Sequence, residues 1–123
     1  IAKKRILNAA YYDKCFSKIS EIRIPPRPSE FRIVYHLYIV FGQQRDALLE
    51  YCLRQGIEAK VHYPTPIYRQ PALSYLGYKE GDFPVSDLHT KSIITFPCDQ
   101  HLTREEMDYV VNTVREFYQK RLI

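Results

Sequence analysis

Apolar residues recur along the chain at spacings that predict helices and strands in alternation. Residues 3–19 place apolar side chains every three or four positions, which is typical of an amphipathic helix. The residues on its predicted apolar side are Ile6, Ala9, Ala10, Asp13, Phe16 and Ile19. Three prolines within residues 23–30 then predict an extended connector, because each proline removes a backbone donor and fixes φ.

Residues 32–63 predict two strands joined by a helix. Residues 32–41 are dominated by β-branched and aromatic side chains, which favour a strand that is largely buried. Residues 43–55 show helical spacing and end at Gly56, a residue type favoured just after a helix. Residues 57–63 alternate apolar and polar side chains and predict a half-exposed second strand.

The last part of the chain predicts a loop, two helices and a third strand. Residues 71–78 predict a short helical turn, and Pro84 is expected to be the first residue of a helix that ends at about Ser92. The segment 93–97 predicts a short strand. Thr103 and Glu106 have the spacing of a capping box at the start of the final helix. The predicted buried face of that helix consists of Val110, Val111, Val114, Phe117 and Tyr118.

This order predicts a small two-layer α/β (α+β) sandwich with a three-stranded mixed or antiparallel sheet and helices mainly on one face. The first two strands should be parallel with a right-handed crossover, and the third should insert between them, antiparallel to both, in a split β-α-β arrangement. We expect residues 1–31 to form an N-terminal helix and connector, and residues 32–123 to form the small C-terminal domain.

Charge and cysteine content narrow the class of protein. The net charge is +4, but residues 1–32 hold eight Lys and Arg against three Asp and Glu, so the rest of the chain is close to neutral. This distribution argues against a nucleic-acid partner.

No apolar run approaches the roughly 18 residues that span a bilayer, so no membrane association is expected. Cys15, Cys52 and Cys98 are far apart and odd in number, which predicts buried, reduced thiols in a cytoplasmic protein.

The chain contains no complete catalytic constellation. The glycine-rich phosphate loops, the nucleophile elbow and the HExxH zinc motif are missing, and the histidines do not show metal-ligand spacing. His36 is expected to be a packed residue of the first strand. His89 and His101 are expected on the surface.

The stretch "KVHYPTPIYRQPA", residues 60–72, combines polar and aromatic groups with three prolines. His62 and Tyr63 stand where a strand passes into this loop, a common position for ligand contacts. Proline lowers the entropy cost of ordering a loop, so one interpretation is that this loop is pre-organised for binding. The alternative interpretation is that the prolines only keep the connection compact while Tyr63 and Tyr68 pack on the core.

Several segments in order, "VYHLYIV", "RDALLEYCLRQGIEAKVHYPTPIYRQPA", "LGYKEGDFPVSD" and "IITFPCDQHLTREEMDYVVNTVREFY", give the chain a family likeness. It resembles the C-terminal small domain of the DegT/DnrJ/EryC1/StrS aminotransferases, which use pyridoxal 5'-phosphate to aminate nucleotide-linked keto-sugars. The resemblance implies that the cofactor lysine, the acidic partner of the pyridine nitrogen and most phosphate contacts lie in a large domain absent here. The chain begins at Ile1 rather than Met, and we expect it to be part of an enzyme that is inactive alone.

The resemblance also assigns the substrate-binding positions and the partners. The sugar nucleotide would be contacted by His62, Tyr63, Tyr68 and Gln70. Family members often carry His where this chain has Tyr68, which puts an acid–base role there in doubt. Arg69 would meet a phosphate or face solvent. The full enzyme is expected to be a homodimer, and the large domain or a second subunit should dock on apolar residues of the first helix such as Ile6, Tyr11 and Phe16.

Two alternatives remain open from the sequence. One is a stand-alone ferredoxin-like binding module without enzymatic activity, with RNA or a small ligand as its target, although the first strand lacks the glycines of the usual RNA-binding motif. The other is a partial gene product that folds but has lost its function.

Overall fold

The computed structural model describes residues 1–121 and opens with helix α1 (Ala2–Phe16). The predicted helix is confirmed, but its buried face differs from the predicted one, because Ala10 is exposed and Tyr12 is completely buried. The Tyr12 hydroxyl donates to the carbonyl oxygen of Pro97 over 2.7 Å, which satisfies the one polar atom of that side chain. The residues of α1 that face the core are Asn8, Ala9, Tyr12 and Phe16.

A long connector separates two strands of very different length, β1 (Ile22–Arg23) and β2 (Tyr38–Gly42). The predicted strand over 32–41 therefore starts six residues late. Tyr35 adopts a left-handed φ of 54°, which interrupts extended backbone. The Arg5 guanidinium binds the carbonyl oxygens of Tyr35 and His36, each over 2.8 Å, so these carbonyls are not used in the sheet.

His36 is exposed in the connector rather than packed in a strand, and the prediction of a core histidine is wrong. Its backbone carbonyl, not its imidazole, makes the contact with α1.

The sheet has the order β1-β2-β3, where β3 is Ile93–Phe96 and every pair is antiparallel. Val40 pairs with Ile94 at the centre of the β2–β3 ladder. On the other side of β3, Lys60 forms an isolated antiparallel bridge with Thr95. The split β-α-β order is thus present, with β3 between its two neighbours, although the predicted second strand over 57–63 is reduced to this bridge.

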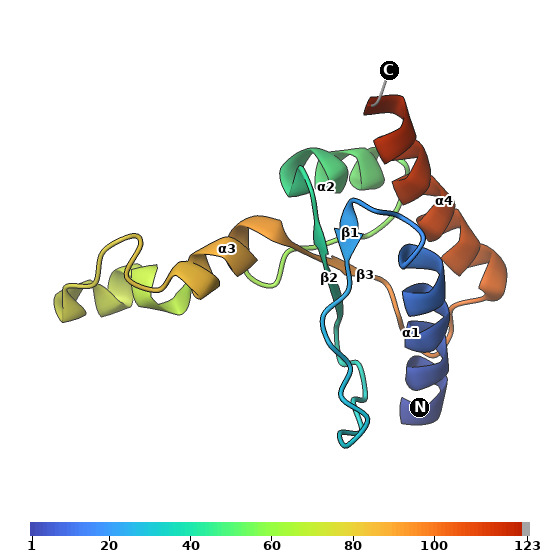
Figure 1. The fold of residues 1–123 in the computed structure, drawn as a ribbon, viewed down its shortest axis with the longest axis horizontal. Coiled ribbons are helices and arrows are strands. Elements are labelled where there is room, and N and C mark those ends of the chain that lie inside the picture. Colours follow the sequence, from blue (N-terminus) through green and yellow to red (C-terminus); the bar gives the residue numbers. More distant parts are fainter. Residues whose placement is uncertain (122–123) are drawn as a thin grey trace.

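One face of the sheet carries the core. Helices α2 (Arg45–Arg54) and α4 (Arg104–Arg121) pack with α1 against it, as Figure 1 shows. Tyr38 packs against Tyr12 with tilted rings whose centroids are 4.9 Å apart, and the alternate β2 residues Tyr38, Val40 and Gly42 are all buried. The predicted fold class, with helices mainly on one face, is confirmed.

The start and the buried face of α4 follow the predicted pattern. The Thr103 amide donates to the Glu106 carboxylate over 2.8 Å, and the Glu106 amide donates to Thr103 Oγ1 over 3.1 Å. This reciprocal pair is a capping box. All five predicted core residues of the helix are buried.

Residues 61–92 form an extension, which we call the arm. It contains the 3-10 helices η1 (Ile67–Arg69) and η2 (Pro71–Leu76) and the helix α3 (Pro84–Ser92). The short helical turn and the helix opened by Pro84 were both predicted from the sequence. Figure 1 shows the arm projecting away from the sheet, on the side opposite to α1 and α4. Both its ends join the body beside the Lys60–Thr95 bridge.

The cysteine prediction is confirmed in part. Cys52 and Cys98 are buried and Cys15 is half-buried, and all three are free thiols. Within residues 1–121, no helix combines the length and apolar character needed to cross a bilayer.

Candidate functional site

The first residues of the arm bring a histidine beside the end of strand β3. Lys60 and Thr95 exchange two backbone hydrogen bonds, of 2.7 and 3.1 Å, which fix the chain just before the arm. Two residues later, His62 Nδ1 lies 2.9 Å from Thr95 Oγ1. The Tyr63 ring stands edge-on to the His62 ring at 5.3 Å between centroids and is 68% exposed. Two of the predicted substrate-binding side chains are therefore adjacent at one position.

An open groove of about 820 Å³ runs along the arm from this point. His62, Tyr63 and Gln70 line it together. Polar groups thus stand at the rim, where Gln70 is exposed and its Nε2 lies 3.5 Å from the carbonyl oxygen of Thr65. The apolar part of the lining consists of Pro66, Ile67, Phe83, Pro84, Val85 and Ile93. A concave apolar surface with a few polar groups is the common form of a small-molecule site.

Tyr68 has a different position from the other three predicted residues. It is buried in the arm and does not line the groove. Its hydroxyl donates to the Asp87 carboxylate, which also accepts the Gly81 amide over 2.9 Å. Burial and the Asp87 carboxylate raise the pKa of Tyr68, and the Tyr68 hydroxyl lowers the pKa of Asp87. The pair ties η1 to α3.

His89 is a groove residue that the sequence reasoning missed. It was expected on the surface, but it is half-buried on α3 and lines the groove opposite the loop. Its ring packs on Phe41, with centroids 4.9 Å apart, on the face of the sheet that the core helices leave uncovered. Side chains along β2 alternate between the two faces of the sheet, and Phe41 points away from the core. This alternation was the sequence feature that could have indicated a packing partner on that face. His101 is exposed, as predicted.

Arg45 holds the groove wall to the body. It is 7% exposed, and its guanidinium donates over 2.7 Å to each of the carbonyl oxygens of Thr90 and Ile93. A cation at the C-terminal end of α3 also complements the helix dipole. Sequence patterns gave no sign of this contact, because the partners are backbone atoms 45 and 48 residues away.

The remaining charged groups do not complete a catalytic arrangement in the described part of the chain. Arg69 does not line the groove, and its Nη1 lies 3.6 Å from the Glu80 carboxylate. Every lysine side chain is exposed, and none lines the groove. No cluster of metal-ligating side chains occurs within residues 1–121. The arrangement can bind, orient and shield a ligand, and it offers no nucleophilic amine to react with one.

Comparisons with known proteins place this geometry in context. The sequence model described as the DegT/DnrJ/EryC1/StrS aminotransferase family matches residues 1–115. A "Pleiotropic regulatory protein" of Geobacillus stearothermophilus is 32% identical over 118 residues, which are 94% of this chain and 32% of that protein. A dTDP-3-amino-3,6-dideoxy-alpha-D-galactopyranose transaminase of Aneurinibacillus thermoaerophilus is 30% identical, over 89% of this chain and 29% of that protein.

A solved structure agrees with these relatives. The crystal structure of DesV from S. venezuelae, in complex with a ketimine intermediate, superimposes with a TM-score of 0.89 at 28% identity. The match covers 94% of this chain and 31% of DesV. The chain thus spans about a third of the length of the relatives it matches.

Proposed function

The chain belongs to the DegT/DnrJ/EryC1/StrS aminotransferase family, and from this premise we propose that it is the C-terminal small domain of a pyridoxal 5'-phosphate-dependent enzyme that transfers an amino group to a nucleotide-linked keto-sugar. Its part is to contact the sugar nucleotide and help close the site. The observation that carries the proposal is the groove in which His62, Tyr63 and Gln70 line a common surface. In this assignment residues 1–31 lead out of the large domain and residues 32–123 form the small one, with α1 and β1 packing into its core and sheet.

The names of the relatives support the substrate class. The Aneurinibacillus thermoaerophilus protein and a Streptomyces venezuelae protein, which is 27% identical, are both named transaminases of dTDP-linked sugars. A nucleotide-linked sugar presents phosphate oxygens, hydroxyl groups and an apolar ring face, which suit a polar rim over an apolar wall.

The residues of this chain do not fit a covalent pyridoxal phosphate site. A Schiff-base lysine has to be desolvated or otherwise tuned and aimed at the cofactor, whereas every lysine here is exposed and away from the groove. The amino-transfer chemistry is therefore assigned to the rest of the enzyme, and this chain acts on the substrate side only.

Within the groove, each predicted residue has a role that its chemistry allows. His62 presents a ring nitrogen, Tyr63 a hydroxyl and an exposed aromatic face, and Gln70 an amide to the phosphate and sugar oxygens. Ile67 and Phe83 exclude water from one side of the ligand. Tyr68, tied to Asp87, supports the loop from behind and reaches the substrate only if the arm rearranges.

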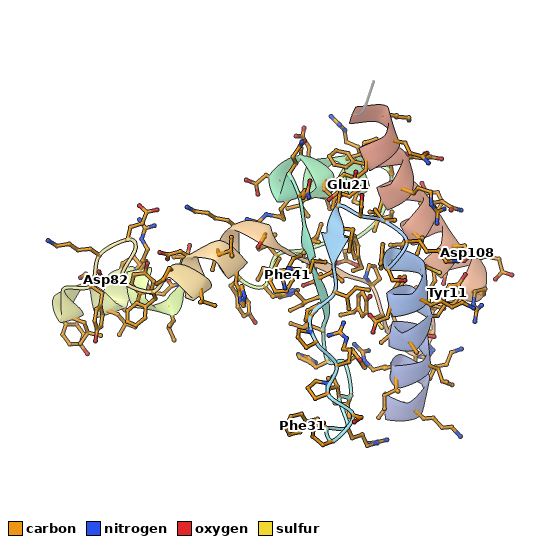
Figure 2. The ribbon with its side chains drawn as sticks, viewed as in Figure 1. Tyr11, Glu21, Phe31, Phe41, Asp82 and Asp108 are labelled. Atoms are coloured by element: carbon orange, nitrogen blue, oxygen red, sulfur yellow. The ribbon has the colours of Figure 1, made fainter. Side chains whose placement is uncertain are left out.

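The arm also has an apolar surface that we assign to contact with the large domain of the enzyme, which in its full form we propose to be a homodimer. Apart from Tyr63, which is assigned to the substrate, the most exposed apolar side chains of the arm are Tyr75, Ile67, Val85, Leu88 and Tyr78. The docking surface expected on α1 is reduced, because Phe16 is fully buried and Ile6 and Tyr11 are half-buried. The Tyr11 hydroxyl donates to Asp108 of α4, within the chain itself (Figure 2). The length of the relatives outside the match supports a large domain as the occupant.

The occupant can be tested in solution. With the large domain as the partner, the 123-residue chain should sediment as a monomer, and a chain carrying the large domain should protect Tyr75 and Val85 from hydroxyl-radical labelling. A concentration-dependent dimer that Val85→Ser abolishes would make a second copy the occupant instead.

The free thiols support a cytoplasmic location.

The substrate assignment is tested by NMR titration of the ¹⁵N-labelled chain with dTDP and dTDP-glucose. We expect shifts at His62, Tyr63 and Gln70, and weaker binding after His62→Ala. Tyr75→Phe is the matched control, because Tyr75 is 79% exposed on η2 and does not line the groove. Shifts confined to residues outside the groove would overturn the assignment.

Reading the coding DNA upstream of Ile1 tests whether a lysine-bearing large domain is encoded in frame.

A further inference from the structure

We propose that Thr95 is the positioning residue for His62: its hydroxyl donates to Nδ1 and so holds the imidazole as the tautomer that carries its proton on Nε2. The groove then receives an N–H donor from His62. The identity of the ligand that meets this donor rests on the proposed function, whereas the tautomer itself does not.

The hydroxyl of Thr95 is held in a rigid setting. Thr95 lies on strand β3, between β2 and the Lys60 bridge, and is 8% exposed. Its backbone amide donates to the Lys60 carbonyl over 2.7 Å, and its carbonyl accepts the Lys60 amide over 3.1 Å. It also pairs with Ile39 of β2 on its other side. The position of Oγ1 is therefore fixed by the sheet on both edges, and the loop that bears His62 starts from the same bridge.

The direction of the hydrogen bond follows from the needs of the two groups. A threonine hydroxyl has one hydrogen to donate, and a buried donor without an acceptor is costly. Within residues 1–121, His62 Nδ1 at 2.9 Å is the hydrogen-bond partner that the structure gives to Thr95 Oγ1. With Thr95 as the donor, Nδ1 is the acceptor. A neutral imidazole that accepts at Nδ1 carries its proton on Nε2.

This assignment defines what His62 can recognise. Nδ1 is occupied by Thr95, so Nε2–H is the group that the ring offers to the groove. It matches an acceptor on the ligand, such as a phosphate, carbonyl or hydroxyl oxygen, and it disfavours a ligand that presents only a donor there. A freely rotating ring would present either character and would discriminate less.

A two-bond ¹H–¹⁵N spectrum of the 123-residue chain, taken with the ring neutral, shows which nitrogen carries the proton. In the unmodified chain we expect the His62 proton on Nε2 alone. Thr95→Val removes the hydroxyl but keeps the shape, and we expect a mixture of tautomers and averaging of the ring between rotamers. Thr95→Ser restores a hydroxyl and should restore the single tautomer.

The matched control is Thr113→Val. Thr113 is equally buried, and its hydroxyl donates to a backbone carbonyl within α4 over 2.7 Å, away from the groove. It should leave the His62 spectrum unchanged. Affinity for dTDP should fall about fivefold in Thr95→Val, as expected for one lost hydrogen bond.

Two results would overturn the role of Thr95. One is a proton on Nδ1 in the unmodified chain, a measurement that needs no variant and is unaffected if Thr95→Val fails to fold. The other is a folded Thr95→Val chain whose His62 tautomer and rotamer match those of the unmodified chain. If the tautomer is as proposed but dTDP does not bind the groove, the substrate assignment fails and the role of Thr95 stands.

Discussion

Arg45, in the first turn of α2, donates from Nη2 to the backbone carbonyl oxygen of Thr90 near the end of α3 over 2.7 Å. The same guanidinium also binds the carbonyl oxygen of Ile93, the first residue of β3. A single buried cation thus joins a core helix, the arm and the sheet. Together with the packing of His89 on Phe41, this side chain holds one groove wall against the body.

Replacement of Arg45 by Ala should destabilise the chain strongly. The change removes charge-assisted hydrogen bonds and leaves two carbonyl groups without their partner, so we expect a loss of about 2–3 kcal/mol in the free energy of unfolding. Arg45→Lys should recover only part, because an ammonium cannot reproduce the planar fork. Urea unfolding followed by circular dichroism measures both.

Arg54→Ala is the control for that series. Arg54 lies in the same helix and pairs with Glu50, but both side chains are largely exposed, so a change below about 0.5 kcal/mol is expected. Equal effects of Arg45→Ala and Arg54→Ala would contradict a structural role for the Arg45 contacts.

The capping box of α4 should contribute measurably to stability. Thr103→Ala removes the side-chain acceptor of the Glu106 amide and should cost about 1 kcal/mol. Thr103→Ser keeps the acceptor and should be close to neutral. The midpoints of urea unfolding compare the two variants, and a Ser variant as unstable as the Ala variant would show that the threonine acts through its methyl group.

Loss of the Tyr68 hydroxyl should loosen the arm and leave the body intact. Tyr68→Phe removes the donor to Asp87, which links η1 to α3 through the turn at Gly81. We expect faster amide hydrogen exchange over residues 79–88 and unchanged exchange in β2 and β3. Tyr75→Phe, on the exposed side of η2, is the control. Uniformly faster exchange across the whole chain would indicate global destabilisation instead.

Stability should fall as the pH rises above about 9. Burial raises the pKa of the Cys52 thiol from 9.0 to about 11, and burial likewise raises that of Cys98 to about 11. The folded state therefore keeps its thiol protons longer than the unfolded state, so the contribution of each thiol is complete below pH 9 and is lost between pH 9 and 11. Each loss amounts to about 2–3 kcal/mol.

Unfolding in urea at pH 7.5, 9 and 10.5 checks this window. Cys52→Ala removes one titrating group and should make the decline shallower. Part of the decline should persist in that variant, because burial also raises the pKa of Tyr12 and Tyr38. A decline of the same steepness with and without Cys52 would assign the whole effect to other groups.

Local sequence patterns were sufficient to predict a helix or strand where the residues that determine it lie within that element. Pro84 marks the start of α3, and Thr103 with Glu106 marks that of α4, because each acts on backbone groups a few residues away. Gly56 with φ of 81° ends α2 for the same reason. The buried face of α4 could also be predicted, since its five predicted core residues recur at helical spacing and are all buried.

The errors arose where distant residues decide the structure. The strand expected over 32–41 is cut short by a left-handed Tyr35 and by Arg5, which lies thirty residues earlier. The second strand is reduced to one bridge, which only its partner Thr95 defines. His62 and Gln70 could be nominated by their loop and by resemblance. The contacts of His62 with Thr95 and of His89 with Phe41 depend on sheet pairing that the sequence does not specify locally.

The position of the arm in the chain has a consequence for how the body can be assembled. β2 and β3 are neighbours in the sheet, yet the whole arm lies between them along the chain. A break at the exposed Gly77, in the arm, would leave fragments 1–77 and 78–123, each carrying one half of the central ladder. We expect the two fragments, made separately, to complement each other and co-purify. The arm would then serve as a tether that raises the rate of pairing, while the sheet and helices alone determine which surfaces meet.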